Sequence, residues 1–187
     1  GPLGLATAPL DLFEQQRRLP GAQRVELGAP ANAEHLEIAR FAAQVRGVDR
    51  RRAPIVRARS LAKRTGVGNA TFDVADIERL PHESESFDVA ILAQSLHATE
   101  DPAVALSEAA RVTRPGGRVV VLDLQPHGEE WVRDRLGHER LGFAPTEMAD
   151  LLVGAGLADV RVERLGARGG EPFRPLLATG VRPTEAS

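Results

Sequence analysis

The amino-acid sequence predicts an α/β fold with a doubly wound, mostly parallel sheet of seven strands. Residues 86–92 (SFDVAIL) and 118–124 (RVVVLDL) are near-continuous apolar runs of strand length, which is typical of strands buried on both faces of a parallel sheet. Segments with helical spacing of apolar residues alternate with such runs, and this alternation indicates βα units. The 187 residues are enough for one domain with a sizeable core.

The expected elements follow from periodicity and from residues that begin or end helices. We expect strands at 24–27, 45–48, 71–75, 86–92, 118–124, 159–165 and 173–181, and helices at 10–19, 31–43, 54–65, 102–112, 128–136 and 145–155. Asp101 can cap the fourth helix, and Pro102 suits its first turn. Gly66 breaks the third helix, and Pro115-Gly116-Gly117 predicts a turn before the strand at 118.

The first four residues, Gly1-Pro2-Leu3-Gly4, resemble the remnant of a cleaved purification tag and lack the features of a signal peptide. We therefore expect residues 1–21 to hold this remnant and an N-terminal helix, and residues 22–187 to form the domain. The natural protein is expected to begin further upstream.

Composition excludes several classes of site. The chain has no cysteine, so disulfides, thiolate metal sites and cysteine nucleophiles are excluded. The net charge of −2 favours neither a polyanionic nor a membrane partner. No apolar run approaches the roughly 20 residues of a membrane helix. We expect a cytoplasmic protein without a metal.

Several short patterns follow one another in a recognisable order. They are Val25-Glu26-Leu27-Gly28, Gly47-Val48-Asp49, Asp76-Ile77-Glu78-Arg79-Leu80-Pro81, Ser86-Phe87-Asp88-Val89, Gln94-Ser95-Leu96-His97 and Arg111-Val112-Thr113-Arg114-Pro115-Gly116-Gly117. In this order the chain resembles class I S-adenosylmethionine-dependent methyltransferases from about residue 23 to residue 183. The resemblance implies a Rossmann-like methyltransferase fold and S-adenosylmethionine as cofactor.

A later segment narrows the resemblance. Residues 136–143 (LGHERLGF), followed by a helix, are similar to methyltransferase domains fused behind ArsR-type winged-helix regulators. This similarity implies a winged-helix DNA-binding module upstream of the present chain. It leaves open whether the chain is a monomer or a homodimer.

The resemblance assigns the cofactor end of the site to residues that follow the first two strands, where ligands bind in this fold. It implies that Glu26 helps to hold the methionine amino group and that Gly28 opens the cofactor loop. Asp49 lies about 21 residues after Gly28, near the spacing at which an acid reaches ribose hydroxyls. The alternatives are that Glu26 caps strand-end amides and that Asp49 caps the following turn.

The third and fourth strands supply the remaining candidates. Asp76 resembles the acid that accepts a hydrogen bond from the adenine amino group, and Ile77 would pack on the ring; the alternative for Asp76 is a helix cap. Gln94 and His97 would lie near the transferred methyl group. His97 is the weak catalytic candidate, as a general base, with a simple wall residue as its alternative.

Three more polar residues lie beyond the fourth strand. His127 and His138 flank the expected helix at 128–136 and could line a substrate pocket, but no carboxylate spacing supports a metal pair. We interpret Asp123 as a structural residue of its strand.

The loop Gly28-Ala29-Pro30-Ala31-Asn32 keeps one glycine where the family uses several, and Pro30 lacks an N–H donor. It is either a reshaped cofactor loop or an ordinary turn that binds no nucleoside. Two functions follow. The first is methyl transfer to an unknown small-molecule acceptor, and the second is a degenerate ligand-sensing or structural module of a transcriptional regulator.

The third expected helix and the residues just before it are strongly basic. Its basic residues are Arg50, Arg51, Arg52, Arg57, Arg59, Lys63 and Arg64. A basic face can meet phosphates, but the chain has few aromatic residues to stack on bases. A solvated helix face is therefore favoured over a nucleic-acid partner.

Overall fold

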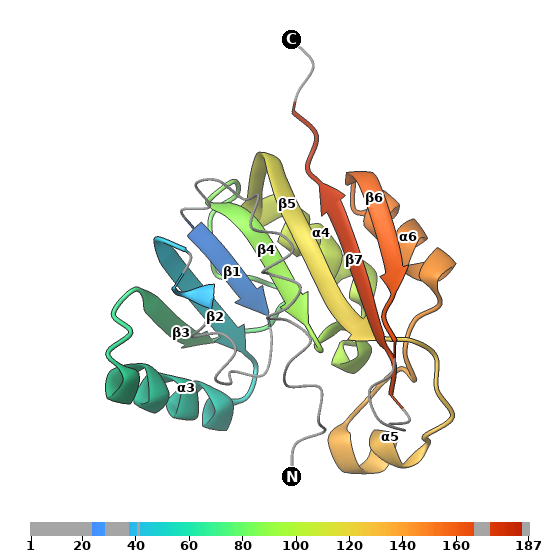
Figure 1. Cartoon of the computed structure of the whole chain (residues 1–187), viewed down its shortest axis with the longest axis horizontal. Coiled ribbons are helices and arrows are strands. Elements are labelled where there is room, and N and C mark those ends of the chain that lie inside the picture. The colour runs from blue at the N-terminus through green and yellow to red at the C-terminus, as the bar shows by residue number, and fades with distance from the viewer. Residues whose placement is uncertain (1–23, 29–37, 41, 167–172, 185–187) are drawn as a thin grey trace.

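A computed structural model describes residues 24–28, 38–40, 42–166 and 173–184. Seven strands form one sheet in the order β3-β2-β1-β4-β5-β7-β6 (Figure 1). The strands are β1 (Arg24–Gly28), β2 (Gln44–Asp49), β3 (Ala70–Val74), β4 (Phe87–Ala93), β5 (Thr113–Leu124), β6 (Ala158–Arg164) and β7 (Pro175–Val181). The helices are α3 (Arg52–Thr65), the 3₁₀ turn η1 (Leu96–Ala98), α4 (Pro102–Val112), α5 (Trp131–Leu136) and α6 (Pro145–Gly154).

The sheet is parallel from β3 to β5, and β7 runs antiparallel to both β5 and β6. The expected mostly parallel sheet is therefore confirmed. In the described part of the chain, each helix is too short or too polar to cross a membrane.

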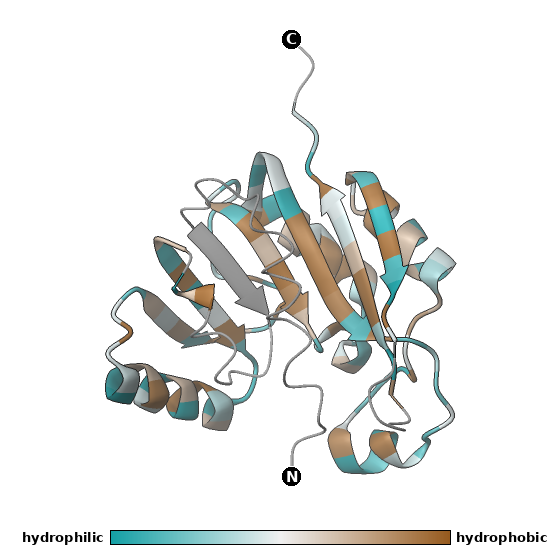
Figure 2. Ribbon diagram, viewed as in Figure 1, coloured by the Kyte–Doolittle hydropathy of each residue, from teal (hydrophilic) through white to brown (hydrophobic). Residues whose placement is uncertain are grey.

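The central strands bury both faces, as their apolar runs predict. On β4, Ala90 and Leu92 belong to the core cluster that also contains residues of α4 and α6. Val89 and Ile91 face the other way and pack with Ile38, Ala39 and Ala42. Figure 2 shows the resulting hydrophobic centre along β4 and β5, whereas hydrophobic and hydrophilic residues alternate along the edge strand β6, most of which is exposed. This alternation along one strand makes the fold doubly wound.

Helix α3 covers the β3 edge of the sheet, on the face to which Val89 and Ile91 point. The ring of Phe72 on β3 packs with Ile55 and Ala58 of α3. Phe72 pairs with Gly47 of β2, where a Cβ would lie only 2.7 Å from the Phe72 ring. Glycine at position 47 therefore lets the aromatic ring lie across the strand, and this contact fixes the helix beside the end of β2.

The helix boundaries confirm the expected capping signals. Asp101 accepts hydrogen bonds from the backbone N–H groups of Ala103 (2.9 Å) and Val104 (3.3 Å) at the start of α4. Pro102 occupies the first turn, where its missing N–H costs nothing. Helix α3 ends at Gly66, whose φ of 72° is the left-handed conformation that glycine adopts readily.

Two boundaries differ from the prediction by three residues or more. The strand expected from residue 118 begins at Thr113, which already pairs with Phe87, and the expected turn is a bend inside β5. Gly116 has φ 76° there, and a Cβ on Gly117 would lie 2.7 Å from the Asp88 carbonyl oxygen. Helix α5 begins at residue 131 rather than 128. The expected helix at 10–19 and most of that at 31–43 lie outside the described residues.

Residues 126–142, here called the α5 loop, leave the sheet after β5 and return to it before α6. Its base is closed by two backbone bonds, from His127 N to Leu141 O (3.0 Å) and from Phe143 N to Leu124 O (2.8 Å). Gly142 has φ 90°, and a Cβ there would lie 2.3 Å from the Gln125 carbonyl oxygen. The closed base holds α5 beyond the carboxyl ends of β4 and β5 (Figure 1).

Candidate functional site

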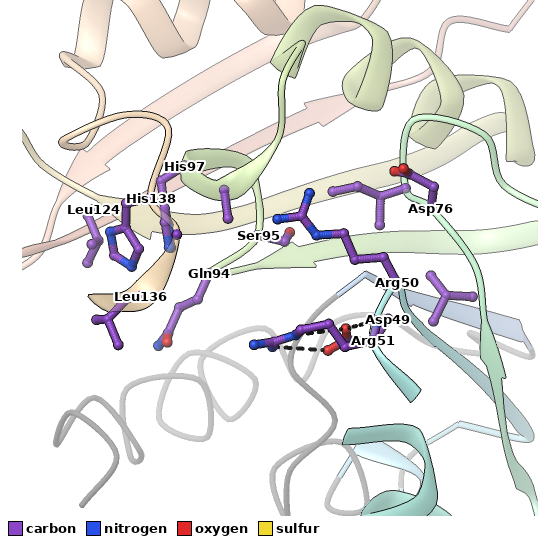
Figure 3. A pocket seen from close by; sticks show the side chains of 14 residues that line it. Asp49, Arg50, Arg51, Asp76, Gln94, Ser95, His97, Leu124, Leu136 and His138 are labelled. Atoms are coloured by element: carbon purple, nitrogen blue, oxygen red, sulfur yellow. Dashed lines mark hydrogen bonds and ion pairs between the residues drawn. The ribbon is translucent and has the colours of Figure 1, made fainter. Parts of the chain in front are cut away.

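A cavity of about 460 Å³ lies at the carboxyl ends of the parallel strands (Figure 3). Side chains that follow β2, β3 and β4, together with the end of β5 and the α5 loop, line it. Five of the seven residues predicted from sequence to bind the cofactor or to act in catalysis are brought together here, namely Asp49, Asp76, Ile77, Gln94 and His97. The two acids lie on one side of the cavity, and His97 and His138 lie on the opposite side (Figure 3).

Strand β1 carries the two remaining predicted residues. It lies between β2 and β4, and Gly28 pairs with Val48 on one side and with Leu92 on the other. The carboxyl end of β1 therefore meets the same edge of the sheet as the cavity. The side chain of Glu26 and the loop at 29–32 lie outside the described residues, so their roles stay predictions.

Asp49 is buried at the end of β2, with 8% of its surface exposed. Its Oδ1 accepts a hydrogen bond from the backbone N–H of Arg51 at 2.8 Å. The Arg51 guanidinium donates to the same carboxylate, from Nε at 3.3 Å and from Nη2 at 3.4 Å (Figure 3). The turn-capping contact considered for Asp49 is thus present, and it fixes the carboxylate on the cavity wall. The ribose role stays a prediction.

Asp76 and Ile77 lie on the loop after β3. The carboxylate of Asp76 accepts a hydrogen bond from Glu78 N at 3.0 Å, and its carbonyl accepts one from Arg79 N at 3.1 Å. Asp76 therefore caps a tight turn; the helix cap considered from the sequence is wrong because no helix begins there. Ile77 is 8% exposed and belongs to the main core cluster while lining the cavity.

Gln94 ends β4 in an unusual backbone conformation. Its φ is 51°, in the left-handed region that few non-glycine residues adopt. Its N–H donates to Leu122 O at 2.7 Å, so pairing with β5 continues through the bend. The side chain extends along the cavity wall (Figure 3). Backbone strain of this kind concentrates at functional positions, which favours a binding role for the bend.

The sequence predicts only a structural role for Asp123, but its carboxylate is hydrogen-bonded to His97. Asp123, in β5, is 1% exposed, and its Oδ1 lies 2.8 Å from His97 Nδ1. The carboxylate also accepts backbone N–H bonds from Leu96 (3.1 Å), His97 (3.4 Å) and Leu124 (2.8 Å). The sequence did contain a signal for this contact, namely an acid within an otherwise apolar strand. A charge buried in such a strand needs hydrogen-bond partners of this kind.

His138 of the α5 loop packs against His97, with ring centroids 4.0 Å apart and an interplanar angle of 44°. Backbone N–H groups of Glu139 (2.9 Å) and Arg140 (3.0 Å) donate to the His97 carbonyl, so the loop is docked on η1. His138 is 8% exposed. Burial, reinforced by the neighbouring His97 and His127, lowers the pKa of His138 to about 4.

His127 does not share the cavity with His138. It lines a separate cavity of about 280 Å³ with Gln125, Glu129, Arg164 and Arg174 among others. Burial and the proximity of His97 lower the pKa of His127. The two histidines considered together from sequence therefore face different spaces. Among the described residues, no cluster of three or more histidine and acidic side chains could hold a metal ion.

The basic stretch around α3 does not form one uniform face. Arg50 and Arg51 line the cavity. Arg59 donates from Nε to the Phe72 carbonyl at 2.8 Å and from Nη2 to Asp73 at 3.3 Å, so it binds α3 to β3. The remaining basic side chains, Arg52, Arg57, Lys63 and Arg64, are exposed to solvent.

Comparison with known proteins agrees with this geometry. Residues 25–121 match the methyltransferase domain family. Over 62 residues the chain is 45% identical to the ubiquinone/menaquinone biosynthesis C-methyltransferase UbiE of Bdellovibrio bacteriovorus, covering 33% of this chain and 26% of that protein. Over 108 residues it is 33% identical to the ubiquinone biosynthesis O-methyltransferase of Hahella chejuensis, covering 57% and 45% respectively.

A solved structure shows the same fold. Phosphoethanolamine N-methyltransferase 2 of Haemonchus contortus, in complex with S-adenosyl-L-methionine, superimposes with a TM-score of 0.78 at 15% identity, covering 95% of this chain and 53% of that one. The chain belongs to the methyltransferase domain family, as the motif order indicated. It spans less than half of the length of the curated relatives that it matches.

Proposed function

We propose that this chain is an S-adenosylmethionine-dependent methyltransferase domain that acts on a small-molecule acceptor. The observation that carries the proposal is the cavity at the carboxyl ends of the parallel strands, where acids that follow β2 and β3 meet residues that follow β4. When bound, S-adenosylmethionine supplies a methyl group on a positively charged sulfonium. The work left to the protein is chiefly alignment of donor and acceptor.

The side chains that line the cavity have the chemistry that a nucleoside needs. Asp49 presents a carboxylate whose orientation is fixed by the Arg51 backbone, and a carboxylate can accept two ribose hydroxyl bonds. Asp76 and Ile77 offer an acceptor and an apolar surface for adenine. We assign the methionine portion to Glu26 and Gly28, because β1 ends between β2 and β4. Gln94 would lie between the two ends of the bound molecule.

The acceptor would occupy the end of the cavity formed by His97, His138, Leu124 and Leu136. A volume of about 460 Å³ lies within the range of small-molecule sites. Both curated relatives described above are named for biosynthesis of small quinone molecules, which supports a small acceptor over a macromolecule.

The test is calorimetric titration of the chain with S-adenosylmethionine and with S-adenosylhomocysteine. We expect micromolar binding that Asp49→Ala weakens at least about tenfold, since it removes a charged hydrogen-bond acceptor. Asp73→Ala is the matched control, because Asp73 is a half-exposed acid on β3 that pairs with Arg59 outside the cavity. Absence of binding at millimolar ligand would contradict the proposal and favour the alternative, a ligand-sensing or structural module of a regulator.

A further inference from the structure

We infer that His97 is the catalytic base of this domain, that Asp123 is its positioning residue, and that the acceptor therefore presents a hydroxyl group. The inference rests on the proposed function and deepens it. It starts from a contact between β5 and the turn after β4 that joins residues 26 positions apart in the chain.

The hydrogen bonds around Asp123 determine which nitrogen of His97 carries the proton. Oδ2 accepts from Leu96 N and His97 N, and Oδ1 accepts from Leu124 N. A carboxylate with this set of donors acts as an acceptor toward Nδ1 as well, at 2.8 Å. The neutral imidazole is then the Nδ1–H tautomer, and its Nε2 carries the lone pair. Within the described part of the chain, Nε2 has no hydrogen-bond partner, and the ring lines the cavity.

The groups that face the His97 ring favour this role. Asp123 reaches it from β5, and His138 packs on it from the α5 loop. His127, on the same loop, is the other histidine that interacts with it electrostatically. With a pKa of about 4, His138 stays neutral near pH 7 and is too weak a base to compete for a hydroxyl proton. It adds no positive charge that would oppose protonation of His97.

The proton balance identifies the acceptor class. As the acceptor oxygen forms its bond to the methyl carbon, the carbon–sulfur bond breaks and its electron pair remains on sulfur. The hydroxyl proton passes to Nε2 of His97, and the buried Asp123 carboxylate stabilises the imidazolium that forms. An acceptor that is already ionised or carries no proton, such as a carboxylate or a thioether, would need no base here. A neutral amine attacks with its own lone pair, and a thiol ionises far more readily than an alcohol. A phenol or alcohol gains most from the base, because its oxygen becomes a strong nucleophile only as its proton leaves.

The first test reads the tautomer without any reaction. In the ¹⁵N-histidine-labelled chain at pH 7.5, long-range nitrogen–proton couplings should show His97 with its proton on Nδ1. Asp123→Asn, which keeps the shape and removes the charge, should lose this uniform tautomer. His127→Gln is the control, because His127 lines the other cavity, and it should leave the His97 signals in the Nδ1–H pattern. An Nε2–H tautomer in the unsubstituted chain would overturn the inference.

The second test uses catechol as the acceptor probe, because an unsubstituted phenol keeps its proton near pH 7, with methylation measured by chromatography. His97→Gln should lower the rate about 100-fold or more, the usual range for loss of a general base. The affinity for S-adenosylhomocysteine should change less than about threefold, and thermal melts should confirm that the variant folds. In Asp123→Asn the rate should fall and its dependence on pH should shift.

The outcomes separate the inference from the proposed function. If the unsubstituted chain binds the cofactor but does not methylate catechol, the hydroxyl class is overturned and the methyltransferase proposal stands. Equal rates in His97→Gln and the unsubstituted chain would overturn the catalytic role. A chain that fails to bind either form of the cofactor would remove the proposed function, and the inference with it.

Discussion

The guanidinium of Arg51 lies against the carboxylate of Asp49, with Nε 3.3 Å from Oδ1 and Nη2 3.4 Å from Oδ2. The two side chains differ in exposure, since 61% of the Arg51 side chain and 6% of the Asp49 side chain are accessible. An ion pair with one solvated partner contributes little, typically 1 kcal/mol or less. The backbone bond from Arg51 N at 2.8 Å persists when the guanidinium moves away. A ribose can therefore displace the arginine side chain at small cost.

This relationship predicts a contrast between two variants. Arg51→Ala should tighten binding of S-adenosylhomocysteine by no more than about fivefold, because it removes a weak competitor for Asp49 and leaves the backbone bond in place. Asp49→Ala should weaken binding at least about tenfold. Calorimetric titration of both variants measures the contrast. A loss of affinity in Arg51→Ala as large as that in Asp49→Ala would mean that Arg51 itself contacts the ligand.

A second prediction concerns the clamp between α4 and the loop that carries Asp76. The Glu108 carboxylate accepts from Arg111 Nε (2.6 Å), Arg111 Nη2 (2.8 Å) and Leu80 N (2.8 Å). Arg111 also donates to the carbonyls of Leu80 and His82. Glu108→Gln should lower the free energy of unfolding by about 1–3 kcal/mol, since it weakens charged hydrogen bonds at a partly buried site. Urea unfolding at pH 7 measures this change.

The clamp also sets a pH dependence. The hydrogen bond from Arg111 is the main reason that the pKa of Glu108 is lowered. Its stabilising contribution is therefore present above the ordinary carboxyl pKa and is lost as pH falls through the lowered value. The difference in stability between the unsubstituted chain and Glu108→Gln should shrink in acid. Glu83→Gln, at an exposed position of the same loop, is the control and should change stability by less than about 0.5 kcal/mol.

The sheet could be predicted because strands that are buried on both faces of a parallel sheet have near-continuous apolar sequences. The runs at 86–92 and 118–124 are apolar on both faces, and both became central strands. Asp101 and Pro102 fixed the start of α4 for a similarly local reason. The predicted start of β5 lies too far along the chain, because Gly116 and Gly117 are typical of a turn. Pairing with β4 on both sides of the bend, a non-local fact, makes it one strand.

The site could be predicted only in part, for the same reason. Asp49, Asp76 and Gln94 each end or follow a strand, so the rule that ligands bind at carboxyl ends of strands finds them. The bond between His97 and Asp123 depends on β4 and β5 being neighbours in the sheet. Its only local sign was an acid inside an apolar strand. The position of His138 depends further on the closed base of the α5 loop, which no periodicity reveals.

His138 gives the third prediction, a loss of stability in mild acid. Its pKa is about 4 in the folded chain and about 6.5 in an unfolded one. Because the unfolded chain takes up the proton first, stability is fully present above pH 6.5 and falls as pH decreases toward 4. The full effect is on the order of 3 kcal/mol. Urea unfolding at pH 7.5, 6.0, 5.0 and 4.5 measures it.

The control for this acid effect is His138→Gln, which should flatten most of the dependence between pH 6.5 and 4.5. A smaller slope in the same direction should remain, because burial also lowers the pKa of His127. Equal stability of the unsubstituted chain at pH 7.5 and 5.0 would contradict the prediction that His138 is buried in its neutral form.

The α5 loop supplies the last prediction, through a series of three glycines. Gly142 has φ 90°, and an added Cβ would lie 2.3 Å from the backbone oxygen of Gln125. Gly137 has φ 71° with nothing within 4 Å of an added Cβ, and Gly128 has neither constraint. Gly128→Ala should be neutral or slightly stabilising, and Gly137→Ala should cost about 1 kcal/mol for its left-handed backbone. Gly142→Ala should cost more than both, since the backbone oxygen cannot move without opening the base of the loop.

The series also tests whether the loop base holds His138 in place. In Gly142→Ala, amide hydrogen exchange should rise at His127 and Phe143, whose N–H groups close the base, and the pKa of His138 should return toward 6.5 as its burial is lost. Both changes should be small in Gly137→Ala, because that glycine lies at the end of α5, away from the two closing bonds. Equal effects of the two substitutions would mean that the left-handed backbone, rather than the close approach to Gln125, determines how firmly the loop is held over the site.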